Sequence, residues 1–495
     1  MNKYIIINEK DNVGVALDNL QKDEKIYDSE GKAFYLLENI DMGHKFALRN
    51  LMCGQEVIKY GNIIGRLTEN VREGEHVHSH NLQTTLKQRV SYSYSKVNQI
   101  HPQNQELFFK GYKRPDGRVG VRNEIWIIPT VGCVNSLVQH LRELSKGLIS
   151  GTLENIVSFA HPYGCSQTGE DQEMTRRALS ALAKHPNCGG ILLVGLGCEN
   201  SNIGILRDYL QDIDNNKIRY LQAQDVSNEI EAGISLLEEL ANYAKSFQRE
   251  LVSISNLTIG LKCGASDGLS GITANPLLGK FSDLIVECGG KVILTEVPEM
   301  FGAEQILMNR AESYEVFNKI VTLITDFKDY FINNNQNIYE NPSPGNKEGG
   351  ITTLEDKSLG CIQKAGHSEV RDVLNYGERV RKGGLSLLSS PGNDLVSSTA
   401  LAVSGANLIL FTTGRGTPFG SPVPTIKISS NSKIYNDKKN WIDFDAGVLL
   451  NKEGGLDELN NDFRDYILEV ASGQKVKAEK NGYHDMAIFK SGVTL

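Results

Sequence analysis

The sequence has 495 residues, of which 40% are hydrophobic and 23% are charged, and its net charge is −8 at pH 7. A chain of this length exceeds what one hydrophobic core holds, so we expect two or three globular domains. The acidic balance argues against nucleic acid or an anionic membrane as partner, because both require a basic face. A small anionic substrate needs only a local group of Arg and Lys, and it remains compatible with this composition.

The hydropathy of the chain predicts a cytoplasmic protein. No apolar run approaches the roughly 20 residues of a membrane span. The opening "MNKYIIINEKDNVG" lacks the apolar length and the cleavage site of a signal peptide. The eight cysteines are therefore expected to be reduced, catalytic or metal-binding rather than joined in disulfides.

Residues 1–90 predict a small β domain. Short β-type runs alternate there with glycine turns, as in "KFALRN", "EVIKYG", "IIGRLT" and "HVHSHN". The polar stretch 91–108, "SYSYSKVNQIHPQNQELF", is typical of a linker.

From residue 109 onward, apolar strand-like runs alternate with helical patterns. "EIWIIPTVGC", "NIVSFAHPYGC", "GGILLVGLGC" and "LTIGLKCG" are such runs, and amphipathic segments separate them. This alternation predicts α/β domains with a largely parallel sheet, a central one over 109–250 and a C-terminal one over 251–495. A polar stretch over 333–350 predicts a long loop, which at about 18 residues is expected to be either functional or disordered.

The stretch "EHVHSHN" places His76, His78 and His80 on alternate positions. Alternate residues of a strand share a face, but their side chains lie about 7 Å apart, so a flat strand cannot bring all three to one ion. If the strand ends near Asn81, two of them could reach a metal, and we predict His78 and His80 as ligands. The alternative is a solvated polar strand edge.

Four cysteines follow strand-like runs at or just beyond their ends, namely Cys133, Cys165, Cys198 and Cys263. Ligands of open α/β sheets bind beyond the carboxyl ends of the strands, so these thiols could converge on one crevice. The alternative is that each is a small buried hydrophobic residue. The other four cysteines, Cys361 among them, lack the pattern and are predicted to be structural.

Two metal models stay open at this point. One is a mononuclear ion with His78 and His80 as ligands, and the other is an iron–sulfur cluster held by Cys165, Cys198 and Cys263. No CxxC pair occurs in the chain, so a zinc ribbon is excluded.

Polar residues in glycine-rich turns predict a binding site for a polyhydroxylated anion. Arg122 and Arg415 offer forks for a carboxylate, while Asp267 and Asn346 offer partners for hydroxyl groups. Taken singly, each such residue is more often a turn residue or a solvated charge. The dinucleotide fingerprint, the P-loop and the G-x-S-x-G elbow are all absent, which argues against nucleotide-dependent and serine-hydrolase chemistry.

These stretches resemble the altronate/galactarate dehydratase family almost from end to end. The matching motifs include "EHVHSHN", "DGRVGVRNEIWIIPTVGCVN", "HPYGCSQ", "CGASDGLSGITANP", "LTEVPEMFGAEQ", "YENPSPGNKEGGITTLEDKSLGC" and "FTTGRGTPFG". The resemblance implies a first domain of the SAF type and a hydro-lyase of hexuronate catabolism that uses Fe²⁺ or Mn²⁺. It also implies D-altronate as substrate and 2-dehydro-3-deoxy-D-gluconate as product, because the galactarate branch lacks the histidine run.

Dehydration of a sugar acid requires removal of the C2 proton and loss of the C3 hydroxyl. A divalent ion would stabilise the negative charge that develops beside the carboxylate. His161 is the predicted base, because an imidazole pKa suits proton abstraction at neutral pH. Lys357 is the second choice for the base, or else the acid that protonates the leaving hydroxide.

Two rival functions are a galactarate dehydratase or related sugar-acid lyase, and a sugar-acid binding protein without activity. Neither nucleic acid nor membrane is expected as a partner, and a homo-oligomer is expected.

Overall fold

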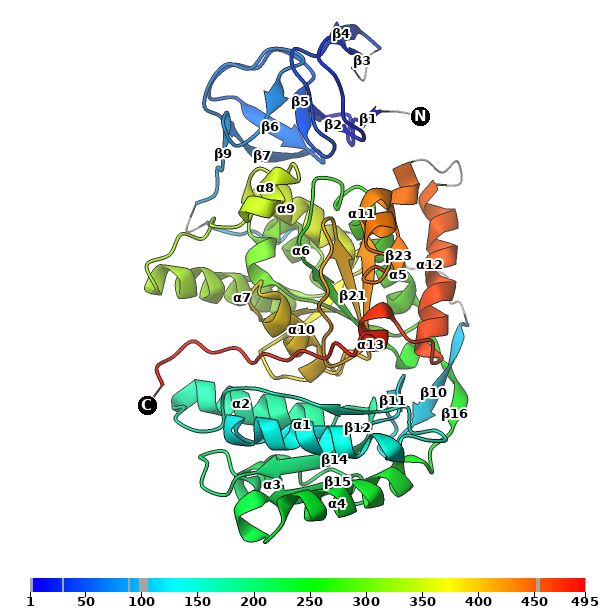
Figure 1. Ribbon diagram of the computed structural model, residues 1–495. Helices are drawn as coiled ribbons and strands as arrows, with labels where there is room; N and C mark the ends of the chain where they lie inside the picture. Colours follow the sequence, from blue (N-terminus) through cyan, green and yellow to red (C-terminus); the bar gives the residue numbers. More distant parts are fainter. Residues whose placement is uncertain (1–2, 29–30, 88–89, 98–105, 451–454, 495) are drawn as a thin grey trace.

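The computed structural model describes residues 3–28, 31–87, 90–97, 106–450 and 455–494, and these form three regions stacked on one another (Figure 1). A small β domain at the top of the view lies on a large α/β region, and a second α/β region lies below it. The predicted fold class, a small β domain followed by α/β structure with parallel sheets, is confirmed. Among the described residues, no helix combines the length and the apolar character needed to cross a membrane.

The first domain consists of short strands joined by glycine turns. One antiparallel sheet contains β1 (Tyr4–Ile5), β2 (Val13–Ala16), β5 (Lys45–Ala47) and β8 (His76–Val77), in that order. A hairpin is formed by β3 (Lys25–Tyr27) and β4 (Ala33–Tyr35), and a third sheet by β6 (Glu56–Lys59), β7 (Asn62–Leu67) and β9 (Leu82–Gln83).

The described part of the predicted linker is attached to the C-terminal region. The Tyr92 hydroxyl donates to Glu304 over 2.8 Å, and the Tyr94 hydroxyl donates to the Ala311 carbonyl over 2.7 Å. Residues 90–97 therefore pack against another domain, which composition alone did not predict. Residues 98–105 of the predicted linker lie outside the described residues.

The central region contains a parallel sheet in the order β13-β12-β14-β15. Its strands are β12 (Glu124–Pro129), β13 (Asn155–Ser158), β14 (Cys188–Gly195) and β15 (Ile218–Gln222), and its helices are α1 (Asn135–Leu144), α2 (Gly169–Ala183), α3 (Ile203–Tyr209) and α4 (Glu229–Ala244). An antiparallel sheet of β10 (Phe108–Lys113), β11 (Val119–Gly120) and β16 (Arg249–Ser253) connects it to the C-terminal region. Every residue of β12 and β14 is buried, as expected for parallel strands covered on both faces.

The C-terminal region is built on a seven-stranded sheet in the order β19-β20-β18-β17-β21-β22-β23, in which all neighbours are parallel. The strands are β17 (Thr258–Cys263), β18 (Lys291–Leu294), β19 (Val370–Leu374), β20 (Gly384–Leu388), β21 (Leu408–Thr413), β22 (Thr425–Ser429) and β23 (Phe444–Asp445). The helices are α5 (Ala274–Glu287), α6 (Glu304–Asn309), α7 (Tyr314–Asn333), α8 (Pro344–Glu348), α9 (Leu354–Cys361), α10 (Asp394–Val403), α11 (Ser432–Asp437), α12 (Gly455–Ala471) and α13 (Lys477–Lys480).

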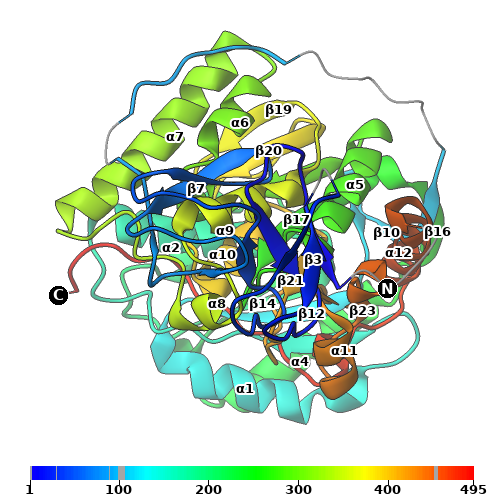
Figure 2. The same ribbon diagram turned by 90° about the horizontal axis from the view of Figure 1, so that it is seen from above.

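The stretch 333–350 contains a helix, α8, rather than one continuous loop. Ser343 begins it as an N-cap that accepts from the Asn346 amide, and Pro344 occupies the first turn, where its missing N–H costs nothing. Seen from above, the first domain lies over α8, α9 and the central strands β17 and β21 (Figure 2).

Candidate active site

A buried group of two thiols and one carboxylate lies where β17 ends. Cys263 is the last residue of β17, Glu299 follows β18, and Cys361 ends α9. The two sulfur atoms are 3.5 Å apart, and a Glu299 oxygen lies 3.0 Å from the Cys263 sulfur and 3.1 Å from the Cys361 sulfur. We call these three residues the Cys/Glu cluster.

Buried lysines surround the Cys/Glu cluster. Lys364 Nζ lies 2.8 Å from the Cys263 sulfur, and Lys357 Nζ lies 2.8 Å from the second Glu299 oxygen. The hydrogen bond from Cys361, with Lys364 nearby, lowers the pKa of Cys263 to about 6. The same hydrogen bond, together with burial, raises the pKa of Cys361 above its ordinary value. The pair therefore holds one thiolate, on Cys263, and one thiol at neutral pH.

Glu299 and Lys357 also hold each other in charged form. Burial opposes ionisation of Glu299, but the charges of Lys357 and Lys364 outweigh it and hold the pKa of this carboxyl well below its usual range. Burial likewise opposes the charge of Lys357, yet Glu299 raises the pKa of this amine above its ordinary value. At neutral pH, Lys357 is an ammonium group that can donate a proton.

Beside the cluster, a narrow crevice lies between the first domain and the C-terminal region. Ser266 contributes a hydroxyl to it that is buried and has no hydrogen-bond partner among the described residues. An unsatisfied buried hydroxyl is costly unless a ligand uses it. The crevice offers a hydrogen-bonding group to a polar ligand, but its free volume of about 10 Å³ holds no more than a water molecule, so a sugar acid would enter only if the first domain moves away. Its lining comprises Lys59, Tyr60, Ser266, Asp267, Gly268, Ser270, Gly271, Asn275, Ile351, Asp356, Lys357, Gly360 and Cys361.

Three of the predicted substrate-binding residues lie at or beside this crevice. Asp267 accepts from the hydroxyls of Ser270 and Ser430, at 2.8 and 2.7 Å. Asn346 donates to the Ser266 carbonyl over 2.8 Å and accepts from Lys357 over 3.2 Å, so it orients this lysine. Arg415 is half exposed and lies against α8, where it pairs with Glu348 at 2.7 Å.

The first domain closes the crevice through a buried ion triplet. Asp356 on α9 accepts from Lys45 at 2.9 Å and from Lys59 at 3.0 Å, and all three side chains are at most 1% exposed. The backbones of Gly43 in the first domain and Gly268 in the C-terminal region are also in close contact, since a Cβ on Gly268 would lie 2.0 Å from the Gly43 carbonyl oxygen. The two domains therefore fit too closely for a side chain at this position.

The predicted histidines lie beside this interface, and the ring of a fourth histidine, His44, lies next to them. The strand that carries them ends at Val77, and the Asn81 side chain closes the following turn by bonding to the His78 amide and the His76 carbonyl, each at 2.9 Å. The ring of His76 lies 5.2 Å from that of His78, 5.5 Å from that of His80 and 5.1 Å from that of His44.

The contacts of this histidine group anchor the first domain on α8. His78 Nε2 lies 2.9 Å from the Lys347 carbonyl, and His44 Nε2 lies 3.0 Å from the Glu348 carbonyl. Burial and the neighbouring rings lower the pKa of His76 to about 3, and burial lowers that of His78 to about 4. The rings of His76 and His78 are thus neutral at physiological pH. The roles of His78 and His80 as metal ligands stay predictions.

His161, the predicted base, lies in the central region and has no free ring nitrogen. Its Nε2 lies 2.8 Å from the Pro129 carbonyl, and its Nδ1 accepts from the Tyr163 amide over 3.2 Å. The ring is 2% exposed, and burial lowers its pKa. In place of the predicted base, the structure gives His161 a structural role in the turn that follows β13.

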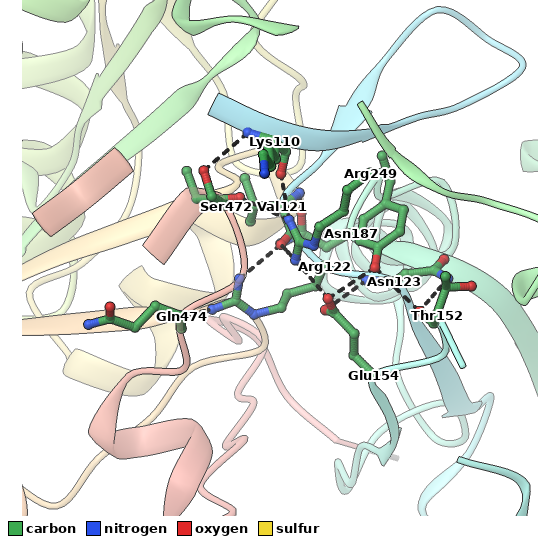
Figure 3. Close-up of polar contacts among 12 residues, drawn as sticks. Lys110, Val121, Arg122, Asn123, Thr152, Glu154, Asn187, Arg249, Ser472 and Gln474 are labelled. Atoms are coloured by element: carbon green, nitrogen blue, oxygen red, sulfur yellow. Dashed lines mark hydrogen bonds and ion pairs between the residues drawn. The ribbon is translucent and has the colours of Figure 1, made fainter. Parts of the chain in front are cut away.

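Arg122, a predicted substrate ligand, joins the central and C-terminal regions instead (Figure 3). Its guanidinium forms a bidentate ion pair with Glu479 at 2.6 and 2.8 Å, and its remaining N–H groups donate to the carbonyls of Val121, Val470 and Gln474. All five donors are used within the protein, so none is left for a carboxylate ligand. The structure thus gives Arg122 a structural role, and its predicted substrate role stays a prediction that this geometry does not support.

The predicted four-thiol crevice does not form. Cys263 is buried in the seven-stranded sheet, whereas Cys133, Cys165 and Cys198 are exposed on the central region. Over the described ranges, the only set of at least three His, Cys, Asp or Glu residues with ligand atoms within 4.8 Å of one another is the Cys/Glu cluster. Cys165, Cys198 and Cys263 therefore cannot share one ion in this conformation.

The donor set of the Cys/Glu cluster suits a soft or borderline ion such as Fe²⁺ better than Mn²⁺, which prefers oxygen ligands. Binding an ion would require the Lys364 ammonium to leave the Cys263 sulfur, whereas Lys357 can stay, because it contacts the other Glu299 oxygen and not the one that lies near the two sulfurs. The group thus fits iron by its chemistry and by its spacing.

Sequence reasoning missed several of these residues. Cys361 was set aside as structural, although it lies four residues after Lys357 and so shares a helix face with it. Glu299 lies in the quoted stretch "LTEVPEMFGAEQ", where nothing in the sequence distinguishes a metal ligand from an ordinary solvated charge. Lys45 and Lys59 carry no local signal, since only the docking of the first domain brings them to Asp356.

Comparison with known proteins gives consistent similarity over the whole chain. Residues 2–85 match the profile "Altronate/galactarate dehydratase SAF domain", residues 111–245 match "D-galactarate dehydratase/Altronate hydrolase, second domain", and residues 254–494 match "D-galactarate/Altronate dehydratase, C-terminal". The chain is 50% identical to an altronate dehydratase of Bacillus subtilis (strain 168) over 498 residues and 49% identical to one of Escherichia coli (strain K12) over 496, with 100% of both chains covered each time. It is 31% identical to a galactarate dehydratase (L-threo-forming) of E. coli over 507 residues, which cover 98% of this chain and 96% of the relative.

Proposed function

This chain belongs to the altronate/galactarate dehydratase family, and we propose that it is a hydro-lyase that converts D-altronate to 2-dehydro-3-deoxy-D-gluconate and water. The observation that carries the proposal is the closed polar crevice beside the Cys/Glu cluster, with its protonated lysine and its unpartnered serine hydroxyl. The higher identity to altronate dehydratases than to a galactarate dehydratase favours altronate over galactarate.

Elimination of water needs a group that protonates the departing C3 hydroxyl, and we assign this role to Lys357. Glu299 keeps the amine protonated, while Asn341 and Asn346 accept from its Nζ at 2.9 and 3.2 Å and fix its direction. A positioned acid of this kind contributes about 10²- to 10⁴-fold to rate. Because it is protonated at neutral pH, Lys357 is better suited to this role than to that of the base.

We assign binding of the sugar hydroxyls to Ser266 and Asp267, which line the crevice, and orientation of Lys357 to Asn346. Arg415 at the rim pairs with Glu348, an exposed partner from which a substrate carboxylate could draw it, because exposed ion pairs are weak. Closure by the first domain excludes water, which strengthens every polar contact inside the crevice.

We further propose that Fe²⁺ binds at Cys263, Glu299 and Cys361. When bound, it supplies Lewis-acid stabilisation of the charge that develops next to the substrate carboxylate. The support for this site is its donor set and the 4.8 Å grouping of its ligand atoms.

The test is to incubate the purified protein and Fe²⁺ with D-altronate and, separately, with galactarate, and to assay the 2-keto acid formed. We expect turnover of altronate. Product from galactarate alone would contradict the substrate assignment and favour the related sugar-acid lyase. Thermal stabilisation by altronate without any turnover would favour a sugar-acid binding protein. A cytoplasmic location and a homo-oligomeric state complete the proposal, and fractionation and light scattering would check them.

A further inference from the structure

Outside the candidate active site, three exposed cysteines lie at one edge of the central sheet. Cys133 follows β12, Cys165 follows β13 and Cys198 follows β14, and these are neighbouring parallel strands in the order β13-β12-β14. Pro129 of β12 pairs with Val194 of β14, and the two cysteines come four residues after these paired positions. Each cysteine directly follows a glycine, at 132, 164 and 197.

Hydrogen bonds tie the three loops together within three residues of each thiol. The Gly132 amide donates to the Tyr163 carbonyl at 2.9 Å, which joins the first loop to the second. The Ser201 amide donates to the Gly164 carbonyl at 3.1 Å, and the Ser166 amide donates to the Asn200 side chain at 3.3 Å, which join the second loop to the third.

The close approach of the first two loops depends on glycine. A Cβ on Gly164, whose φ is +102°, would lie 2.0 Å from the Thr130 carbonyl oxygen. His161 supports the same junction, because its ring bonds to the Pro129 carbonyl in the strand end and to the Tyr163 amide in the second loop. The conformation of these loops is thus specified in detail, although nothing in the proposed altronate chemistry requires it.

A guanidinium group and a helix N-terminus lie close to these loops. The Arg176 guanidinium donates to the Asn200 carbonyl at 2.9 Å and to the Ser201 hydroxyl at 3.3 Å, next to the third loop. The second loop leads into the N-terminus of α2, where the helix dipole is positive. Both features contribute positive electrostatic potential at this edge of the sheet, which favours an anionic group there.

We propose that Cys133, Cys165 and Cys198 bind a [4Fe–4S] cluster, with the fourth iron left without a protein ligand. The three sulfurs do not all lie within the 4.8 Å of one another that a single ion requires. A cluster spreads its thiolate ligands further apart than one ion does, and thiolates are its usual ligands. On binding, each thiol loses its proton to solvent and its sulfur bonds to one iron. Two ferrous ions, two ferric ions and four sulfide ions make up the [4Fe–4S]²⁺ core, so the step needs both kinds of iron salt and sulfide but no further oxidant or reductant.

The experiment uses the full chain, purified without oxygen, treated with iron salts, sulfide and dithiothreitol, and desalted. Iron, acid-labile sulfide and visible charge-transfer absorption are then measured for the unchanged protein and for Cys133→Ser, Cys165→Ser and Cys198→Ser. Cys53→Ser is the matched control, because Cys53 is also exposed but lies in the first domain. Circular dichroism checks that each variant is folded.

We expect about four iron and four sulfide per chain in the unchanged protein and in Cys53→Ser. Each of the other three variants is expected to lose at least half of the sulfide and of the visible absorption. Absence of acid-labile sulfide, or binding of a single zinc ion instead, would overturn the inference.

Sulfide content that is unchanged in the three variants but lost in Cys263→Ser would place a cluster at the active site and would also overturn the inference. Turnover of altronate is recorded separately with Fe²⁺. A chain that turns altronate over without holding sulfide would refute the cluster alone, and one that holds sulfide without turnover would refute the proposed function alone.

Discussion

Replacement of Asp356 by Asn tests how the first domain closes over the crevice. The carboxylate is the shared partner of Lys45 and Lys59, and none of the three side chains is more than 1% exposed. Asn has nearly the same shape but no charge, so two ammonium groups would remain buried without a counter-ion. Breaking a buried ion pair in this way costs about 3–5 kcal/mol.

This cost falls on the contact between domains, because the two lysines come from the first domain and Asp356 comes from α9. If opening of that contact governs exchange, the amides that it protects should exchange roughly 10²- to 10⁴-fold faster, at about 1.4 kcal/mol for each factor of ten. Hydrogen-exchange mass spectrometry of peptides covering 56–67 and 350–361 measures this acceleration.

The matched control is Asp437→Asn, which removes a helical pair with Lys433 in which both side chains are more than half exposed. Exposed pairs contribute little, so the stability change should stay within about 0.5 kcal/mol. Acceleration below about tenfold for Asp356→Asn, or an equal effect of the two substitutions, would refute the argument that this triplet holds the domains together.

Four further predictions concern single residues. Cys361→Ser should lower altronate turnover at least about 100-fold, because a hydroxyl replaces a soft sulfur ligand of the metal. Cys288→Ser, which leaves the proposed ligands intact, should not lower it. The measurement is kcat with added Fe²⁺. Ser266→Ala should raise KM about tenfold without loss of thermal stability, because the hydroxyl has no hydrogen-bond partner among the described residues. A fall in Tm would indicate a structural role instead. Arg122→Lys should lower Tm, because the bidentate ion pair with Glu479 is lost, and should leave kcat/KM of the folded protein within about twofold. A selective rise in KM would instead support the predicted substrate role of Arg122. Stability should fall as pH drops from 6.5 towards 3, because the pKa of His76 is about 3 in the folded protein and 6.5 ordinarily, so the unfolded chain binds the proton at a higher pH than the folded protein does. Measured as Tm against pH, this slope should be flatter in His76→Gln.

The secondary structure of the α/β regions could be predicted well because its signals are local. The runs that contain β12, β14 and β17 are mostly apolar and buried throughout, and each is followed by a helix. Burial of a parallel sheet on both faces produces this pattern directly, so the pattern predicts the sheet. The helix α8 escaped prediction because its five residues are too few to show a period.

The candidate site could be predicted only in part. The glycine-rich turns and a strand end predict Asp267, Asn346, Lys357 and Cys263, and the structure places them at the crevice, beside it or in the Cys/Glu cluster. By sequence, His161 was as suitable for the base as Arg122 was for a carboxylate ligand. The sequence cannot show that a ring nitrogen or a guanidinium is already bonded to backbone carbonyls.

By itself, the amino-acid sequence determined the class of fold, the order of the domains and the family, because periodicity and long motifs are properties of neighbouring residues. The tertiary structure alone decided which distant groups meet. Cys263 reaches Cys361 across 98 residues, and Lys45 reaches Asp356 across 311. The order of strands in the sheet and the docking of the first domain create these contacts. Both depend on the summed burial of whole surfaces, and no short stretch of sequence encodes that sum.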